Sequence, residues 1–229
     1  MAGATTKGAV VASASVPSKS SQSPWASLAI VLAEAGAINK QSAQRASSIW
    51  LIAASAWLSH KLVRTLSTPL GVARIDVRDA RSMHAQALSA APNADLFIAA
   101  AAVADYRPAQ QSLQKIKKSS DATQIALVKN PDIIADVSAA VSAKAKRPLL
   151  VGFAAETENV LENARAKRVR KGLDFIAANH VGPGFGMEAE GNALVLIGAH
   201  SELELGYADK SLLAKRLLQA LIPHLLLNP

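Results

Sequence analysis

Residues 94–108, with the sequence ADLFIAAAAVADYRP, constrain the fold of this chain more than any other stretch. An unbroken apolar run lies between Asp95 and the polar residues 105–107, which are followed by Pro108. Such a run suits a strand buried on both faces of a parallel α/β sheet, and a buried helix is the alternative that periodicity leaves open. The polar end favours the strand, because open α/β sheets bind ligands beyond the carboxyl ends of their strands. The alternative for these polar residues is an ordinary solvated turn.

Composition bounds the class of protein. A chain of 229 residues that is 50% hydrophobic suits one α/β domain or two small ones with a substantial core. The absence of cysteine excludes disulfides, thiolate zinc sites and a cysteine nucleophile, and it fits a cytoplasmic protein. We expect no signal peptide and no membrane partner, because the one long apolar run, residues 49–58, is too short to span a bilayer. Five dispersed histidines predict no protein-built metal centre.

The net charge of +8 is unevenly distributed. Residues 1–70 carry six Lys/Arg and one acid, a net of +5, and residues 71–229 carry 19 and 16, a net of +3. A basic chain can bind nucleic acid or anionic small molecules. We find no nucleic-acid-binding motif and expect no nucleic-acid partner. A basic nucleic-acid-binding module stays the alternative, and a steep loss of binding with salt would support it.

Strands and helices are expected to alternate from residue 72 onward. Asp79 is the predicted N-cap of a helix over residues 80–90, whose inward-facing residues are Met83, Ala87 and Leu88. In the closing helix, Leu212 is predicted to lie on the buried side. A strand–helix–strand order with short connections predicts a parallel βαβ unit. The sequence predicts strands over residues 72–77, 125–128, 149–153, 173–177, 193–197 and 203–205, and helices over residues 26–37, 80–90, 158–171 and 211–227.

Two polar features in this region are candidates for chemistry. Asn130 suits an N-cap, with Pro131 as the first helical residue and Asp132 in the first turn, and such a helix start near lysines is a good anion site. An ordinary capped helix is the alternative. For His180 a structural role is favoured over that of a general base, because no partner stands at a recognisable spacing.

Several segments in order resemble the phosphopantothenoylcysteine synthetase family, the phosphopantothenate–cysteine ligases of coenzyme A biosynthesis. They are AAAAVADYRP (99–108), KIKK (115–118), LVKNPDII (127–134), LVGFAAETENVLENARAKRVRKGLDFIAANHV (150–181), GNALVLI (191–197) and KSLLAKRLL (210–218). The resemblance implies a single Rossmann-like α/β domain over residues 1–229, with a mostly parallel sheet flanked by helices and a family-like core over residues 69–218. It also implies a homodimer and, as partner, a separate flavin-dependent decarboxylase.

The chemistry that the resemblance implies is amide formation between 4′-phosphopantothenate and cysteine through an acyl-cytidylate. The substrates would be CTP, 4′-phosphopantothenate and cysteine, with Mg²⁺ carried by the nucleotide. Lys115 resembles the mobile catalytic lysine of the family, which also contacts the nucleotide. By resemblance, the other nucleotide-binding residues are Ala99, Ala100, Ala101, Asp105, Pro131, Asp132, Ile133, Ile134, Phe153, Lys167 and Lys171.

The N-terminal third, residues 1–68, departs from the family. Ser20 and Ser21 fall where its paired serines stand, but the Asn and the glycines of the phosphate loop are missing. The spacing of the family's motifs is kept here while the residues between them differ. Two compensating reading-frame shifts in the coding DNA would produce this pattern. Genuine divergence and a decayed, inactive copy are the alternatives. An inactive member that only binds nucleotide is therefore the alternative function. A dinucleotide-binding oxidoreductase is disfavoured because G-x-G-x-x-G is absent.

Overall fold

The computed structural model describes residues 9–14, 49–52, 72–110, 112, 114, 124–181 and 191–226. Its elements in chain order are β1 (Ala9–Ala14), β2 (Ile49–Ile52), β3 (Val72–Val77), α3 (Ala80–Ala90), the 3₁₀ turn η1 (Ala91–Asn93), β4 (Leu96–Ala99), β5 (Tyr106–Pro108), β6 (Leu127–Lys129), α4 (Ile133–Val141), β7 (Leu149–Glu156), α5 (Val160–Arg170), β8 (Phe175–His180), β9 (Gly191–Ile197), β10 (Glu202–Asp209) and α6 (Lys210–Leu226).

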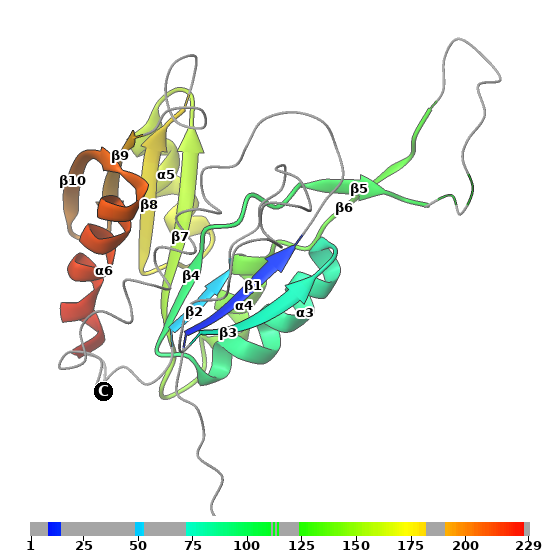
Figure 1. Ribbon diagram of the computed structural model, residues 1–229, viewed down its shortest axis with the longest axis horizontal. Helices are drawn as coiled ribbons and strands as arrows, with labels where there is room; N and C mark the ends of the chain where they lie inside the picture. The colour runs from blue at the N-terminus through cyan, green and yellow to red at the C-terminus, as the bar shows by residue number, and fades with distance from the viewer. Residues whose placement is uncertain are drawn as a thin grey trace, which may run out of the picture.

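One twisted sheet forms the centre of the molecule (Figure 1). Within the described residues it has the strand order β10-β9-β8-β7-β4-β2-β1-β3. The six strands from β8 to β3 are parallel to one another, and β9 is antiparallel to both β8 and β10. This arrangement confirms the Rossmann-like α/β class. Its parallel strands follow the order 3-1-2-4-5-6, which exchanges two strands of the classic 3-2-1-4-5-6 order.

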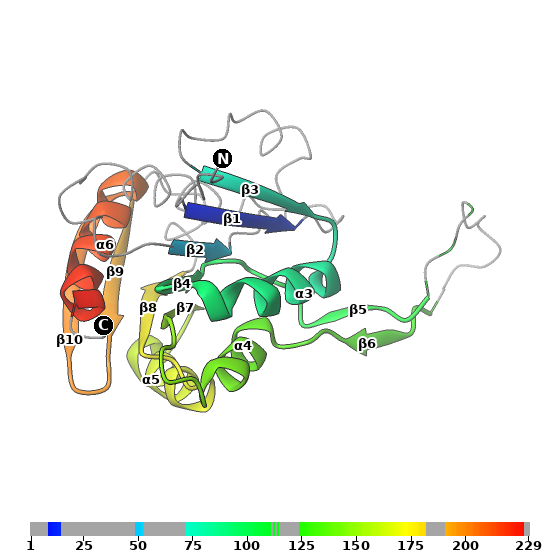
Figure 2. The same ribbon diagram turned by 90° about the horizontal axis from the view of Figure 1, so that it is seen from below.

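Helices cover both faces of the sheet. Helix α6 lies on one face, and α3, α4 and α5 lie on the other (Figures 1 and 2). Strand β4 shows why both layers are needed, because Leu96 and Ile98 pack in the α6 layer while Phe97 packs in the opposite layer, all with 0% exposure. A strand that is apolar on both sides can be buried only between two layers. The prediction of a doubly buried strand is therefore confirmed.

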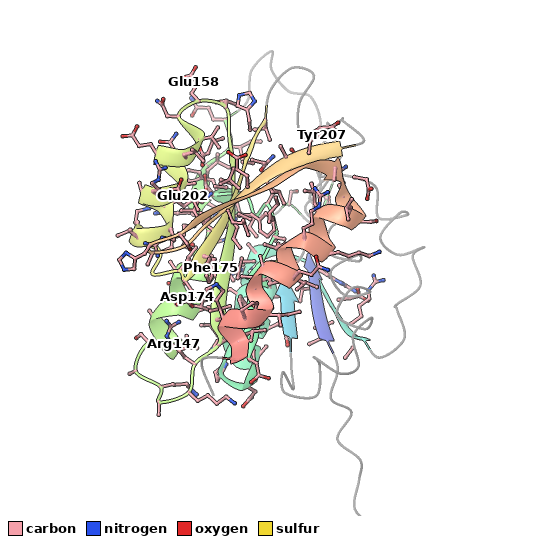
Figure 3. The ribbon with its side chains drawn as sticks, turned by 90° about the vertical axis from the view of Figure 1, so that its left-hand side faces the viewer. Arg147, Glu158, Asp174, Phe175, Glu202 and Tyr207 are labelled. Carbon is pink, nitrogen blue, oxygen red and sulfur yellow. The ribbon has the colours of Figure 1, made fainter. Side chains whose placement is uncertain are left out.

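Helix α6 seals its face with leucines. Leu213, Leu217 and Leu221 are almost completely buried, but Leu212 is 40% exposed, so its predicted inward position is wrong. The predicted apolar face of this helix included Leu212, which lies at its margin, and a helix packed on a sheet buries only the centre of such a face. Figure 3 shows α6 crossing the sheet near Phe175, whose ring centroid lies 4.7 Å from that of His224.

Several predicted boundaries need correction. Strand β4 ends at Ala99, so residues 100–104 form a connecting segment outside the strand. Strand β8 begins at Phe175 and includes His180, and β6 begins at Leu127. Strands β3 and β4 are parallel, as predicted, but β1 and β2 lie between them. These two strands fall in the atypical N-terminal third, where no strand was predicted, because sequence patterning there is weak.

A two-stranded antiparallel ribbon projects from the body of the molecule (Figures 1 and 2). In this arm, β5 pairs with β6 through Tyr106 with Lys129 and Pro108 with Leu127. Its large apolar side chains are unusually exposed, with Tyr106 at 58% and Leu127 at 58%. The sequence predicted no strand at residues 106–108, because their pairing partner lies about twenty residues later, beyond the reach of local patterning.

Candidate nucleotide-binding site

After β2 and after β4, the chain continues to strands that lie toward opposite edges of the sheet. After β2 it reaches β3 on one side, and after β4 and the arm it reaches β7 on the other. Such a reversal between neighbouring parallel strands opens a crevice at their carboxyl ends, where ligands of α/β proteins bind. The segment with Ala100, Ala101 and Asp105 follows β4 at this point, and Asp105 lies beyond the end of the strand, as the sequence predicted.

The alanines at the end of β4 and just after it alternate between the two layers. Ala100 is 2% exposed in the core under α6, whereas Ala99 and Ala101 pack against the opposite core. Asp105 is exposed, and its carbonyl oxygen accepts the backbone N–H of Asn130 at 2.7 Å.

Helix α4 begins shortly after Asn130, which bonds to this segment. The predicted N-cap of this helix is wrong. Asp132, not Asn130, caps the helix, and its Oδ1 accepts the backbone N–H of Ala135 at 3.4 Å. The side chain of Asn130 bonds to the segment after β4 instead. Asp132 takes the cap, since its carboxylate accepts one of the free N–H groups of the first turn, that of Ala135.

Ile133 and Ile134 open α4 with buried side chains. They are 7% and 8% exposed and pack in the core beneath α3 and α4. Their side chains are therefore occupied by the core, and a ligand would meet the N–H groups of this first turn. Free N–H groups at a helix start carry partial positive charge and favour anions.

Two lysines of the α5 segment lie beside the start of α4. Lys171 Nζ lies 2.9 Å from Asp132 Oδ1, and the Lys171 side chain is only 17% exposed. Burial lowers the pKa of the half-buried Lys167, the positive charges of Lys171 and Arg170 lower it further, and Glu156 and Asp132 oppose this. The two lysines thus face one location, with two carboxylates beside them.

Two other cations of α5 have partners within the protein. Arg165 makes a two-pronged ion pair with Glu202 of β10 at 2.6 and 2.9 Å. Arg168 Nη1 donates to the carbonyl oxygen of Leu173. The helix begins at Val160, later than predicted, and Gly172 follows the C-cap Lys171 with a φ of 62°. Only Ala164 of α5 is fully buried.

Phe153 lies on the other face of the sheet from the two lysines. It belongs to β7, pairs with Ala177 of β8 and packs against the core beneath α6. The sheet therefore lies between Phe153 and the group formed by Asp132, Lys167 and Lys171. The Nε2–H of His180 donates to the carbonyl oxygen of Thr157 at 3.0 Å, in keeping with a structural role.

Lys115 and the phosphate-loop positions 15–25 lie outside the described residues, as does the predicted helix over residues 26–37. Their predicted roles stay predictions. Among the described residues, no group of three or more His, Asp or Glu side chains could hold a metal ion. None of the described helices is long and apolar enough to cross a membrane.

Two residues of this region have roles that their local sequence does not indicate. The local pattern predicts an N-cap role for Asn130 and no contact between Asn130 and Arg107. Nη1 of Arg107 donates to the carbonyl oxygen of Lys129 at 2.6 Å and to Oδ1 of Asn130 at 3.1 Å. The available signal was the short apolar pair Leu127 and Val128 followed by the polar residues 129 and 130, and it indicates a short strand but not its partner.

The family of the chain follows from its relatives. The family model described as "DNA/pantothenate metabolism flavoprotein C-terminal domain" matches residues 35–224. The coenzyme A biosynthesis bifunctional protein CoaBC of Vibrio cholerae is 47% identical over 152 residues, which cover 65% of this chain and 37% of that protein. CoaBC of Haemophilus influenzae is 42% identical over 186 residues, 81% of this chain and 44% of that protein. The chain thus spans less than half of the length of these relatives.

Solved structures share the fold. The C-terminal domain of a CoaBC protein has a TM-score of 0.61 at 22% identity and covers 96% of each chain. The DNA/pantothenate metabolism flavoprotein of Streptococcus pneumoniae has a TM-score of 0.68 at 14% identity and covers 95% of this chain and 99% of that one. From the family model and the identity to CoaBC over four fifths of its residues, the chain belongs to the phosphopantothenoylcysteine synthetase family.

Proposed function

We propose that this protein is a phosphopantothenate–cysteine ligase that uses CTP. The observation that carries the proposal is the meeting of a helix start and two lysines at the carboxyl edge of a Rossmann-like sheet. A triphosphate is the ligand that such an arrangement favours, because it offers several negative charges at once. A related solved structure, Cab2, is a mutant in complex with phosphopantothenate-cysteine, and it shares this fold with a TM-score of 0.57.

The proposed reaction has two steps. The carboxylate of 4′-phosphopantothenate attacks the α-phosphorus of CTP, an acyl-cytidylate forms and pyrophosphate leaves. The amine of cysteine then attacks the acyl carbonyl carbon, the amide forms and CMP leaves. The protein supplies position and positive charge rather than a covalent intermediate.

The proposed nucleotide-binding residues fall into two groups. Backbone groups of residues 99–105 and of the first turn of α4 would approach the nucleotide directly. Lys167 and Lys171 would neutralise its phosphates, and Phe153 would provide an apolar surface for the base or ribose. Lys171 forms an ion pair with Asp132, and triphosphate binding would give it a second negative partner. The proposed catalytic lysine is Lys115, whose ammonium would balance charge that appears only in the transition state.

A magnesium ion carried by the triphosphate fits these residues. Mg²⁺ keeps most of its water and needs only one or two carboxylates from a protein when phosphates bind it as well. Asp105 is exposed and follows the crevice, and it makes no ion pair with any residue that the structure describes. We propose Asp105 as the carboxylate that meets the metal-bound nucleotide.

We also propose that the ligase acts as a homodimer in the cytoplasm and that a flavin-dependent decarboxylase is its partner. The bifunctional CoaBC relatives support the second part, since this chain matches less than half of their length. The exposed apolar arm supports the first, because isolated apolar ribbons are rarely left uncovered in soluble proteins.

The deciding experiment measures pyrophosphate release from CTP with 4′-phosphopantothenate, in the presence and absence of cysteine. We expect release together with the amide product when all three substrates are present. Lys115→Ala should abolish the amide while CTP still binds. Equal loss of turnover and binding in this variant would make Lys115 a binding residue.

The same experiment separates the ligase from its alternative. CTP binding without pyrophosphate release would identify an inactive family member whose nucleotide site survives. The altered N-terminal third is the feature that favours this alternative. Restoration of the expected Gly-Ser-rich loop in another reading frame of the coding DNA would explain the loss.

A further inference from the structure

We propose that Asn130 is a positioning residue of the nucleotide site, acting through the segment after β4 and the start of α4. This inference rests on the proposed function, because both segments belong to the proposed nucleotide site. They are about 26 residues apart in the sequence, with the arm between them. Asn130 directly follows β6, where the chain leaves the arm. Its hydrogen bonds reach Ala104 and Asp105, which directly precede β5, where the chain enters the arm.

The contacts form a closed set that we call the Asn130 clasp, made of residues 104, 105, 107, 129 and 130. The backbone N–H of Asn130 donates to the carbonyl oxygen of Asp105 at 2.7 Å, and its Nδ2 donates to that of Ala104 at 2.8 Å. Its Oδ1 accepts Nη1 of Arg107 at 3.1 Å, and the same Nη1 donates to the carbonyl oxygen of Lys129 at 2.6 Å.

Burial makes the clasp strong and specific. Asn130 is 9% exposed, although it lies at the root of a projecting arm. Shielding from water strengthens each hydrogen bond, and removal of one partner leaves a buried group unsatisfied. The charge of Arg107 strengthens its bonds to two oxygens at once. Both polar atoms of the Asn130 side chain are engaged within the protein, so the residue orients its neighbours rather than holding the ligand.

The position of the clasp explains what it would control. Asp105 is bound on one side of it, and Pro131 and the N-cap Asp132 follow on the other. The clasp therefore sets the distance between the proposed metal-facing carboxylate and the helix start that meets the phosphates. A displacement of about 1 Å in such groups can cost a large factor in catalysis.

The test compares Asn130→Ala and Asn130→Asp with the natural enzyme in steady-state kinetics. Asn130→Asp keeps the shape and the contact with Arg107 but turns an oxygen toward the carbonyl of Ala104. We expect both variants to raise the KM for CTP by about tenfold or more and to leave the KM for cysteine within about twofold. A purely structural residue would instead lower kcat with little change in either KM, because fewer molecules would be folded.

Asn192→Ala is the matched control. Asn192 is also a buried asparagine, 7% exposed, but its Oδ1 bonds to the neighbouring N–H of Ala193 in β9. The control should keep the KM for CTP within about twofold of the natural value. A rise as large as that of the Asn130 variants would overturn the proposal.

A second measurement does not depend on activity. Hydrogen exchange should be faster at residues 104–109 and 129–132 in both Asn130 variants and unchanged in β7. If exchange does not change, the clasp does not hold these segments and the proposal fails. If exchange accelerates while the KM for CTP stays constant, the clasp exists but does not position the nucleotide, and the proposal also fails. Absence of CTP turnover in the natural protein would overturn the proposed function alone.

Discussion

Single residues set the charge at the proposed site, and Lys167 is the most informative of them. Its ammonium is half-buried beside another lysine, and both burial and that neighbour lower its pKa below the ordinary value of 10.5. An unfolded chain therefore binds more protons than the folded one between the two pKa values. The contribution of Lys167 to stability rises with pH in this window, and bound phosphate would reverse the effect by favouring the charged form.

We expect CTP affinity to fall as pH rises through the lowered pKa of Lys167, beginning below 10.5. The loss of the ammonium charge removes its attraction to the phosphates. Lys167→Met should bind CTP more weakly at neutral pH and lose most of this pH dependence. Calorimetric titration at several pH values measures both effects. Lys215→Met, at an exposed position on α6, is the control, and equal behaviour of the two variants would assign the effect to general charge.

At the scale of elements, the junction between α5 and β8 depends on one backbone conformation. Gly172 has a φ of 62°, and a Cβ built on it would lie 2.7 Å from Oγ of Ser138 in α4. The same Oγ donates to the carbonyl oxygen of Gly172 at 2.9 Å. A residue with a side chain would meet both a strained conformation and a neighbour in contact.

Gly172→Ala should lower the free energy of unfolding by about 1–3 kcal/mol, as other strained backbone positions do. Chemical denaturation of the single and double variants measures the loss. Ser138→Ala together with Gly172→Ala removes the close contact but leaves the positive φ, so we expect only part of the stability to return. If the double variant is as stable as Ser138→Ala alone, the backbone conformation costs nothing and only the contact matters.

For the whole molecule, the arm is the feature that a second copy would cover. Its exposed apolar side chains include Tyr106 and Leu127, and Ile125 lies just before β6 with 66% exposure. A ribbon of two strands is at best marginally stable alone in water, which favours a partner along it. The Asn130 clasp fixes only its root.

We expect the natural chain to have twice its mass of 23.8 kDa in light scattering, and Leu127→Asp to yield the monomer. A buried carboxylate at the interface would cost more than the lost apolar contact. Val169→Asp is the control, because Val169 is 68% exposed on α5, away from the arm. A dimer that persists in Leu127→Asp, or a monomeric natural chain, would contradict the proposed interface.

The sequence by itself determined the elements with local signals. The N-cap Asp79 and the helix Ala80–Ala90 are as predicted, since capping and helical periodicity operate within one or two turns. Met83 and Ala87 are buried for the same reason. The doubly apolar run before Asp105 predicted a buried strand with a ligand site after it. The motifs around residues 99–108 and 150–181 also indicated the family, which the relatives confirm.

Only the tertiary structure decided how these pieces meet. The order of β1 and β2, the burial of Ile133 and Ile134, and the face that Phe153 occupies all depend on segments far apart in the sequence. Asn130 is the clearest case. The residue pattern around Asn130 predicted an N-cap, but its side chain forms hydrogen bonds with Ala104 and Arg107 instead. A buried amide is most stable where all of its polar atoms have partners.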